Sequence, residues 1–153
     1  MESKVTRAIC ILSNPELGIK GLVKFEEEND KTKISAEFTG LKPGKHGFHI
    51  HEFGNLSNAC ITAGAHYNPF GKTHGGPHDE ERHVGDLGNI EADSNGNAKL
   101  ELVDSLIKLT GQYSVIGRSV IVHEGEDDLG KVILINNRVA LKIQRLLDML
   151  VLD

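Results

Sequence analysis

The sequence predicts an all-β domain, arranged as a sandwich or Greek-key barrel. Seven short segments alternate apolar and polar side chains or are rich in β-branched residues, and turns rich in Asn, Asp, Pro and Gly separate most of them. This pattern is typical of antiparallel strands with one buried and one wet face. The 153 residues fit a single domain over 1–153, without repeat or linker. We therefore expect seven or eight strands around one core.

The expected strands follow one another closely at first and resume after a long gap. Val23 and Phe25 share one face of the second strand, and Ile34, Ala36 and Phe38 share one face of the third. No helical period occurs before residue 139. We expect strands at residues 6–12, 21–27, 31–38, 45–52, 86–92, 98–103 and 119–123.

The gap, residues 53–85, shows no periodicity. A connection of this length without secondary structure is unusual inside a compact domain, unless something other than local structure holds it. Three histidines lie in this segment: His66, His74 and His83. A long metal-binding loop is the expectation that follows.

Charge and composition exclude several classes of partner. The net charge is −5 and no basic stripe exists, so we expect no nucleic-acid partner. No apolar stretch reaches membrane-spanning length, and the polar N-terminus lacks the apolar region of a signal peptide. Two cysteines, Cys10 and Cys60, allow one bridge at most. These features favour a cytoplasmic protein with no membrane partner.

Six histidines and one aspartate have spacings that suit two metal ions. His49 and His51 occupy positions i and i+2 of an expected strand, so their imidazoles face the same side, while Ile50 points into the core. His123 closes another strand. All-imidazole ligation suits copper in both of its oxidation states, whereas three imidazoles and a carboxylate suit tetrahedral zinc. The remaining candidates come from the loop and its exit: His66, His74, His83 and Asp86.

Each of these histidines has an ordinary explanation when taken alone. A single His-x-His on a strand is usually a surface pair, and loop histidines are usually solvated. The joint pattern, flanked by glycine turns, favours metal binding. If His66 loses both ring protons, it can serve both ions as a bridging imidazolate. His78 is interpreted as a surface histidine, and His46 as a structural histidine that hydrogen-bonds the backbone near the site.

Four stretches of the chain carry a family resemblance: residues 47–54, 74–77, 82–89 and 116–123. They resemble the copper/zinc superoxide dismutase family, over a match of about residues 4–131. The resemblance implies an eight-stranded, immunoglobulin-like Greek-key barrel. It also implies an antioxidant enzyme that converts two superoxide anions to O₂ and H₂O₂ by alternating Cu(II) and Cu(I). A homodimer and delivery of copper by a copper chaperone are implied as well.

The same resemblance assigns the ligands and their neighbours. It implies copper held by His49, His51, His66 and His123, and zinc held by His66, His74, His83 and Asp86. Asp127 would hydrogen-bond His49 and His74, orienting one ligand of each metal. The catalytic residues would be His66 and Arg138, of which His66 moves protons. Arg138 resembles the family's arginine beside copper, because Arg138-Val139-Ala140 is similar to the entry of the family's last strand.

After Lys131 the resemblance fails, and residues 132–153 form a divergent tail. The family's glycine-rich loop is shortened here, and its basic residues are absent. Cys60 has no cysteine after Arg138 to pair with, and Cys10 is expected to be a buried thiol. Residues 141–153 fit either a short amphipathic helix or a strand. Arg138 also fits a solvated turn arginine.

Two other functions stay open at this point. The altered tail is compatible with a catalytically impaired or inactive metal-binding homologue. The acidic segment 124–128 is similar to the dismutase-like domain of a copper chaperone, although the chain has His123 and no Cys-x-x-Cys motif.

Overall fold

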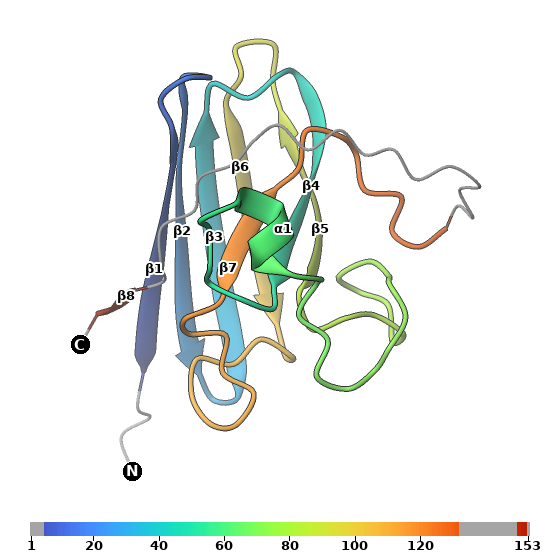
Figure 1. Cartoon of the computed structure of the whole chain (residues 1–153). Coiled ribbons are helices and arrows are strands. Elements are labelled where there is room, and N and C mark those ends of the chain that lie inside the picture. Colours follow the sequence, from blue (N-terminus) through green and yellow to red (C-terminus); the bar gives the residue numbers. More distant parts are fainter. Residues whose placement is uncertain (1–4, 132–149, 153) are drawn as a thin grey trace.

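The computed structural model describes residues 5–131 and 150–152 of the chain. They form eight strands and one short helix (Figure 1). The all-β prediction is confirmed. The strands are β1 (Thr6–Asn14), β2 (Ile19–Glu28), β3 (Lys31–Thr39), β4 (Gly44–His51), β5 (Asp86–Ala92), β6 (Ala98–Asp104), β7 (Ser119–Val122) and β8 (Leu150–Leu152), and the helix is α1 (Ala59–Ala63).

The strands pair antiparallel throughout, in the order β7-β4-β5-β6-β3-β2-β1-β8. The consecutive strands β4, β5 and β6 lie side by side, and β7 returns beside β4 (Figure 1). That spatial order is a Greek key. It places the second half of β4 between the start of β5 and the short strand β7, although long stretches of sequence separate them.

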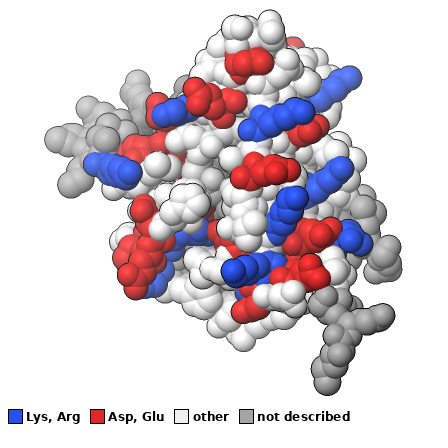
Figure 2. Space-filling view, turned by 180° about the vertical axis from the view of Figure 1, so that it is seen from behind, with Lys and Arg blue, Asp and Glu red and all other residues white. Residues whose placement is uncertain are grey.

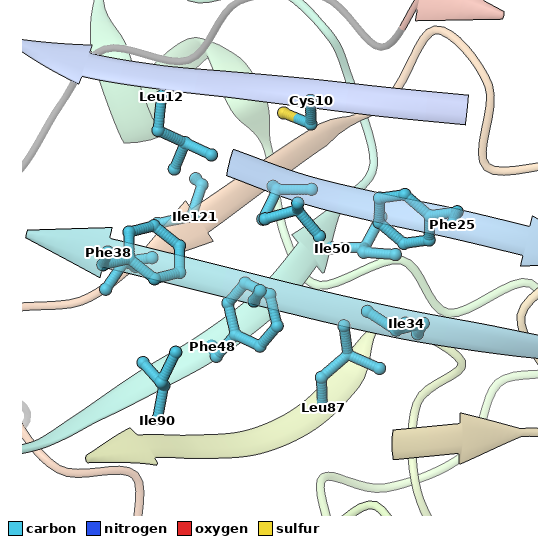
Figure 3. Close-up of a cluster of buried hydrophobic side chains, with 14 of the residues drawn as sticks. Cys10, Leu12, Phe25, Ile34, Phe38, Phe48, Ile50, Leu87, Ile90 and Ile121 are labelled. Carbon is cyan, nitrogen blue, oxygen red and sulfur yellow. The ribbon is translucent and has the colours of Figure 1, made fainter. Parts of the chain in front are cut away.

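The core lies between the two halves of this curled sheet (Figure 3). Val23 and Phe25 of β2 are buried, as are Ile34, Ala36 and Phe38 of β3, which confirms the expected faces. Figure 3 shows aliphatic and aromatic side chains from several strands filling the interior together. Such a packed interior holds the ends of β4 and β7 rigidly.

The outward faces of β1, β2, β3 and β6 carry charged side chains, together with the exposed Ile11 and Val103. Arg7 pairs with Glu26 at 2.7 Å, and Lys99 pairs with Glu37 at 3.4 Å. Figure 2 shows lysine and arginine intermixed with acidic side chains on the face it views. The described residues contain no helix that has both the length and the apolar character needed to cross a membrane.

All seven expected strands are present, with boundaries within two residues of the expected ones. The helix α1 was not expected, because a single turn is too short to produce a helical period in the sequence. In the tail, Leu150–Leu152 form β8, which pairs with Arg7, Ala8 and Ile9 of β1. Residues 132–149 lie outside the described part.

Candidate metal centre

The candidate ligands converge from four parts of the chain. β4 supplies His49 and His51, whose backbones lie opposite Ile121 and Ser119 of β7. His123 follows β7 directly, and Asp86 begins β5 opposite His49. The long loop supplies the other three histidines, and an isolated β-bridge pairs its His66 with His51 of β4.

The first cluster consists of His49, His51, His66 and His123, which offer ligand atoms within 4.8 Å of one another. Three of its nitrogens are buried without a hydrogen-bond partner: Nδ1 of His49, and Nε2 of His51 and of His123. Buried polar atoms are normally satisfied, so three unsatisfied lone-pair donors at one place fit a cation. An all-imidazole donor set fits copper.

In His49 and His51, the ring nitrogen that points away from the cluster has a hydrogen-bond partner. His49 Nε2 contacts the Asp127 carboxylate at 2.9 Å, and His51 Nδ1 donates to the Gly64 carbonyl at 2.9 Å. Each contact fixes the ring orientation that aims the other nitrogen inward.

Burial keeps these imidazoles neutral. Burial, together with the smaller effect of neighbouring histidines, lowers the pKa of His51 to about 4 and that of His123 to about 3. Burial also lowers the pKa of His49, against the opposing effect of the Asp127 hydrogen bond. Neutral imidazole is the form that binds a metal ion, so lone pairs are available at neutral pH.

The second cluster surrounds Asp86, whose side chain is fully buried. Its Oδ1 lies 2.8 Å from His66 Nδ1 and 3.2 Å from His83 Nδ1, and its Oδ2 lies 2.9 Å from His74 Nδ1. The Nδ1 atoms of His66 and His83 are 3.4 Å apart. Three imidazole nitrogens directed at one carboxylate form the donor set of a zinc site.

Asp86 is held as a carboxylate. Burial alone would raise its pKa, but hydrogen bonds from His66 and His74 and from the Gly75 amide outweigh burial and lower the pKa below its usual range. The backbone N–H groups of Gly75 and His83 donate to Oδ2 at 3.0 and 2.9 Å. The negative charge is thereby fixed at the centre of the three histidines.

His66 belongs to both clusters, and its ring stacks on that of His49 with centroids 4.0 Å apart. Because its Nδ1 faces Asp86, its Nε2 is the nitrogen left for the first cluster.

Asp127 also joins the two clusters. Its carboxylate lies 2.9 Å from His49 Nε2 and 2.6 Å from His74 Nε2. The hydrogen bonds with Asp127 and Asp86 raise the pKa of His74 to about 10, despite partial burial. Asn89 holds the Asp127 backbone through two hydrogen bonds, of 2.7 and 2.9 Å.

The two histidines set apart by the sequence lie as expected. His78 is exposed. His46 is buried, with Nδ1 2.7 Å from the His123 carbonyl and Nε2 2.8 Å from the Lys42 carbonyl. Through these two contacts, the His46 ring joins the turn before β4 to the segment that carries His123.

The buried Arg82–Asp104 ion pair was not expected from the sequence; it joins Arg82 Nη1 to Asp104 Oδ2 at 2.7 Å. Arg82 also donates to the carbonyls of His83 and Val84, at 3.2 and 3.1 Å. It therefore ties the segment before Asp86 to the end of β6. No local signal reveals this contact, because the partners are far apart in the sequence.

Two predictions concern parts that are not described. Arg138 lies outside the described residues, as does the side chain of Cys60. Cys10 is buried in the core, as expected, and forms no disulfide within the described part of the chain.

Comparison with known proteins gives a consistent result. The family model for copper/zinc superoxide dismutase matches residues 19–142, which extends past Lys131 and includes Arg138. The chain is 53% identical to a Cu-Zn superoxide dismutase of Saccharomyces cerevisiae, over 83% of this chain and 84% of that protein. It is 49% identical to an extracellular Cu-Zn superoxide dismutase of Brugia pahangi, over 84% of this chain and 65% of that protein.

The fold has a counterpart among solved structures. The crystal structure of the clock protein EA4 matches with a TM-score of 0.81 and 42% sequence identity, covering 94% of this chain and 90% of that one. The similarity therefore extends over almost the whole length of both proteins.

Proposed function

This chain belongs to the copper/zinc superoxide dismutase family, and on that premise we propose which of its residues bind the two metals and move protons. The protein is an oxidoreductase that converts two superoxide anions and two protons to O₂ and H₂O₂, with copper and zinc as cofactors. When bound, copper supplies the one-electron chemistry by alternating between Cu(II) and Cu(I).

The assignment rests on the three unsatisfied nitrogens of His49, His51 and His123. They would hold copper together with His66. Zinc would be held around Asp86, where three Nδ1 atoms converge on a carboxylate, by His66, His74, His83 and Asp86 itself. Asp127 would orient one ligand in each set through its two hydrogen bonds.

His66 is the proposed proton carrier. Its Nδ1 is directed at Asp86, and its side chain is 22% exposed, so Nε2 is the nitrogen within reach of substrate and water. His66 would donate the Nε2 proton to the peroxide as it forms and recover a proton from water. Within the first cluster, His49 and His51 are almost fully buried, whereas His66 and His123 are partly exposed and the Nε2 atom of His123 is itself buried.

Two single substitutions test the assignment. His123→Ala should lower copper retention and spare zinc, because His123 contributes only to the first cluster. His83→Ala should lower zinc retention and spare copper, because His83 contributes only to the second cluster. His78→Ala, on an exposed histidine outside both clusters, is the matched control. Metal content after dialysis against a chelator is the measurement, and loss of both ions in either variant would contradict the separate sites.

Arg138 is proposed to line the copper site and attract the superoxide anion. Arg138→Ala should reduce turnover several-fold and weaken its dependence on ionic strength. Unchanged turnover would instead support the interpretation of Arg138 as a solvated turn residue.

We further propose a cytoplasmic homodimer that receives copper from a copper chaperone and binds no nucleic acid. The net charge of −5 and the mixed surface charges support the last point. Cell fractionation and sedimentation analysis of the metal-loaded protein test location and assembly. Monomer at all concentrations, or recovery outside the cytoplasm, would contradict the proposal.

A further inference from the structure

His66 differs from His49 and His51 of the first cluster in how its position is fixed. The side chains of His49 and His51 are 4% and 5% exposed and pack in the protein interior, whereas that of His66 is 22% exposed. Core packing therefore cannot hold His66 as it holds the other two. Other contacts must fix the segment that carries it.

The backbone on both sides of His66 is bonded to β4 and its extension. The Ala65 carbonyl accepts from the Glu52 N–H at 2.9 Å, and the Tyr67 N–H donates to the Ile50 carbonyl at 2.8 Å. Glu52 and Ile50 flank His51 in the sequence. The spacing between His66 and His51 thus depends on these two hydrogen bonds.

Arg118 contacts both of these flanking segments. Its Nη1 donates to the carbonyl of Glu52 at 2.8 Å, and its guanidinium carbon lies 3.8 Å from the centroid of the Tyr67 ring. Its Nε donates to the Ser114 carbonyl at 3.2 Å, which fixes the guanidinium plane. A planar guanidinium can stack and donate at its edge at the same time, and an ammonium cannot.

The Tyr67 ring is a suitable support for Arg118. Tyr67 is 3% exposed, and its hydroxyl donates to the Tyr113 carbonyl at 3.2 Å. Because the ring is buried, the stacked guanidinium limits how far residues 66 and 67 can move away from Glu52. Arg118 also directly precedes β7, the strand that leads to His123.

We propose that Arg118 is a positioning residue that sets the distance of His66 from His51 and so maintains the imidazolate bridge between the two metals. The inference rests on the proposed function, in which His66 serves both ions. Arg118 touches neither substrate nor metal; it acts through Tyr67 and Glu52. Its removal should displace His66 and weaken the bridge before it releases either ion.

The test uses the full chain with Cu(II) in the copper site and Co(II) in place of zinc. A bridging imidazolate couples the two spins and suppresses the copper electron paramagnetic resonance signal. The unsubstituted protein should show a suppressed signal. Arg118→Met should restore a several-fold larger signal at full metal content, and Arg118→Lys, which keeps the charge but not the planar group, should restore an intermediate one.

Two controls separate positioning from a general loss of stability. Val23→Ala removes buried volume from β2 and should lower the thermal midpoint while leaving the signal suppressed. Tyr67→Phe keeps the ring and loses only the hydroxyl, so the signal should also stay suppressed.

Full suppression in both Arg118 variants, with only a lowered thermal midpoint, would overturn the inference and leave the proposed function intact. If Arg118→Met does not fold, Arg118→Lys alone decides on the same criterion. An unsuppressed signal in the unsubstituted protein would instead refute the shared role of His66 in the proposed function, and this inference with it.

Discussion

Gly85→Ala is expected to disturb the point at which three segments that carry candidate ligands meet. Gly85 directly precedes Asp86, and a Cβ at this position would lie 2.1 Å from the Ile50 carbonyl oxygen and 3.1 Å from the Tyr67 nitrogen. Both obstacles are backbone atoms, so no side-chain rotation relieves the clash. The backbones must separate by about 1 Å to reach an ordinary contact distance.

That separation acts on a closed triangle of hydrogen bonds. The Ile50 N–H donates to Gly85 at 2.8 Å, the Gly85 N–H to Tyr67 at 3.0 Å, and the Tyr67 N–H to Ile50 at 2.8 Å. Losing two of them at about 1 kcal/mol each, with some buried groups left unsatisfied, gives a destabilisation of about 2–4 kcal/mol. Because Asp86 moves with residue 85, zinc retention should fall on the order of tenfold or more.

Denaturant unfolding of the metal-free protein measures the first effect, and competition with a chelator measures the second. The matched control is Gly125→Ala, because a Cβ at Gly125 meets nothing within 4 Å. A midpoint and zinc retention equal to those of the Gly125→Ala protein would refute the reasoning.

Three further outcomes are expected. Asp127→Asn should weaken retention of the metals on the order of 10- to 100-fold, because the amide cannot orient His49 and His74 as the carboxylate does. Competition with a chelator measures this retention, and unchanged retention would contradict the role of Asp127. Asp104→Asn should cost about 3–5 kcal/mol in denaturant unfolding, because the buried Arg82 charge loses its counter-ion; a cost below about 1 kcal/mol would show that the charge finds compensation elsewhere. In the metal-free protein the pKa of His51 is lower in the folded than in the unfolded state, so as pH drops below 6.5 the unfolded chain is protonated before the folded one. The free energy of unfolding should therefore fall, by up to about 3 kcal/mol near pH 4. The raised pKa of His74 acts oppositely, with stability fully present below pH 6.5 and lost as pH rises toward 10; unfolding midpoints across this range check both signs, and a flat profile would contradict them.

The strands were predictable because each one alternates its buried and exposed residues, and that alternation is a local property of the sequence. Val23 and Phe25 illustrate it: both are buried, and Lys24 between them is exposed. The helix α1 was missed because five residues are too few to show a period. Among the candidate ligands, His49 and His51 were predictable as a pair, since positions i and i+2 of a strand face the same side.

By itself, the sequence determined the fold class, the extents of seven strands and the set of histidines with Asp86, because residue type and short-range spacing carry that information. Only the tertiary structure decided which nitrogen of each ring is left unsatisfied and how the ligand segments are held. Gly85 against Ile50, and Arg118 against Tyr67, are contacts between residues remote in the chain. Their significance depends on how the strands pair, and no local pattern encodes such pairing.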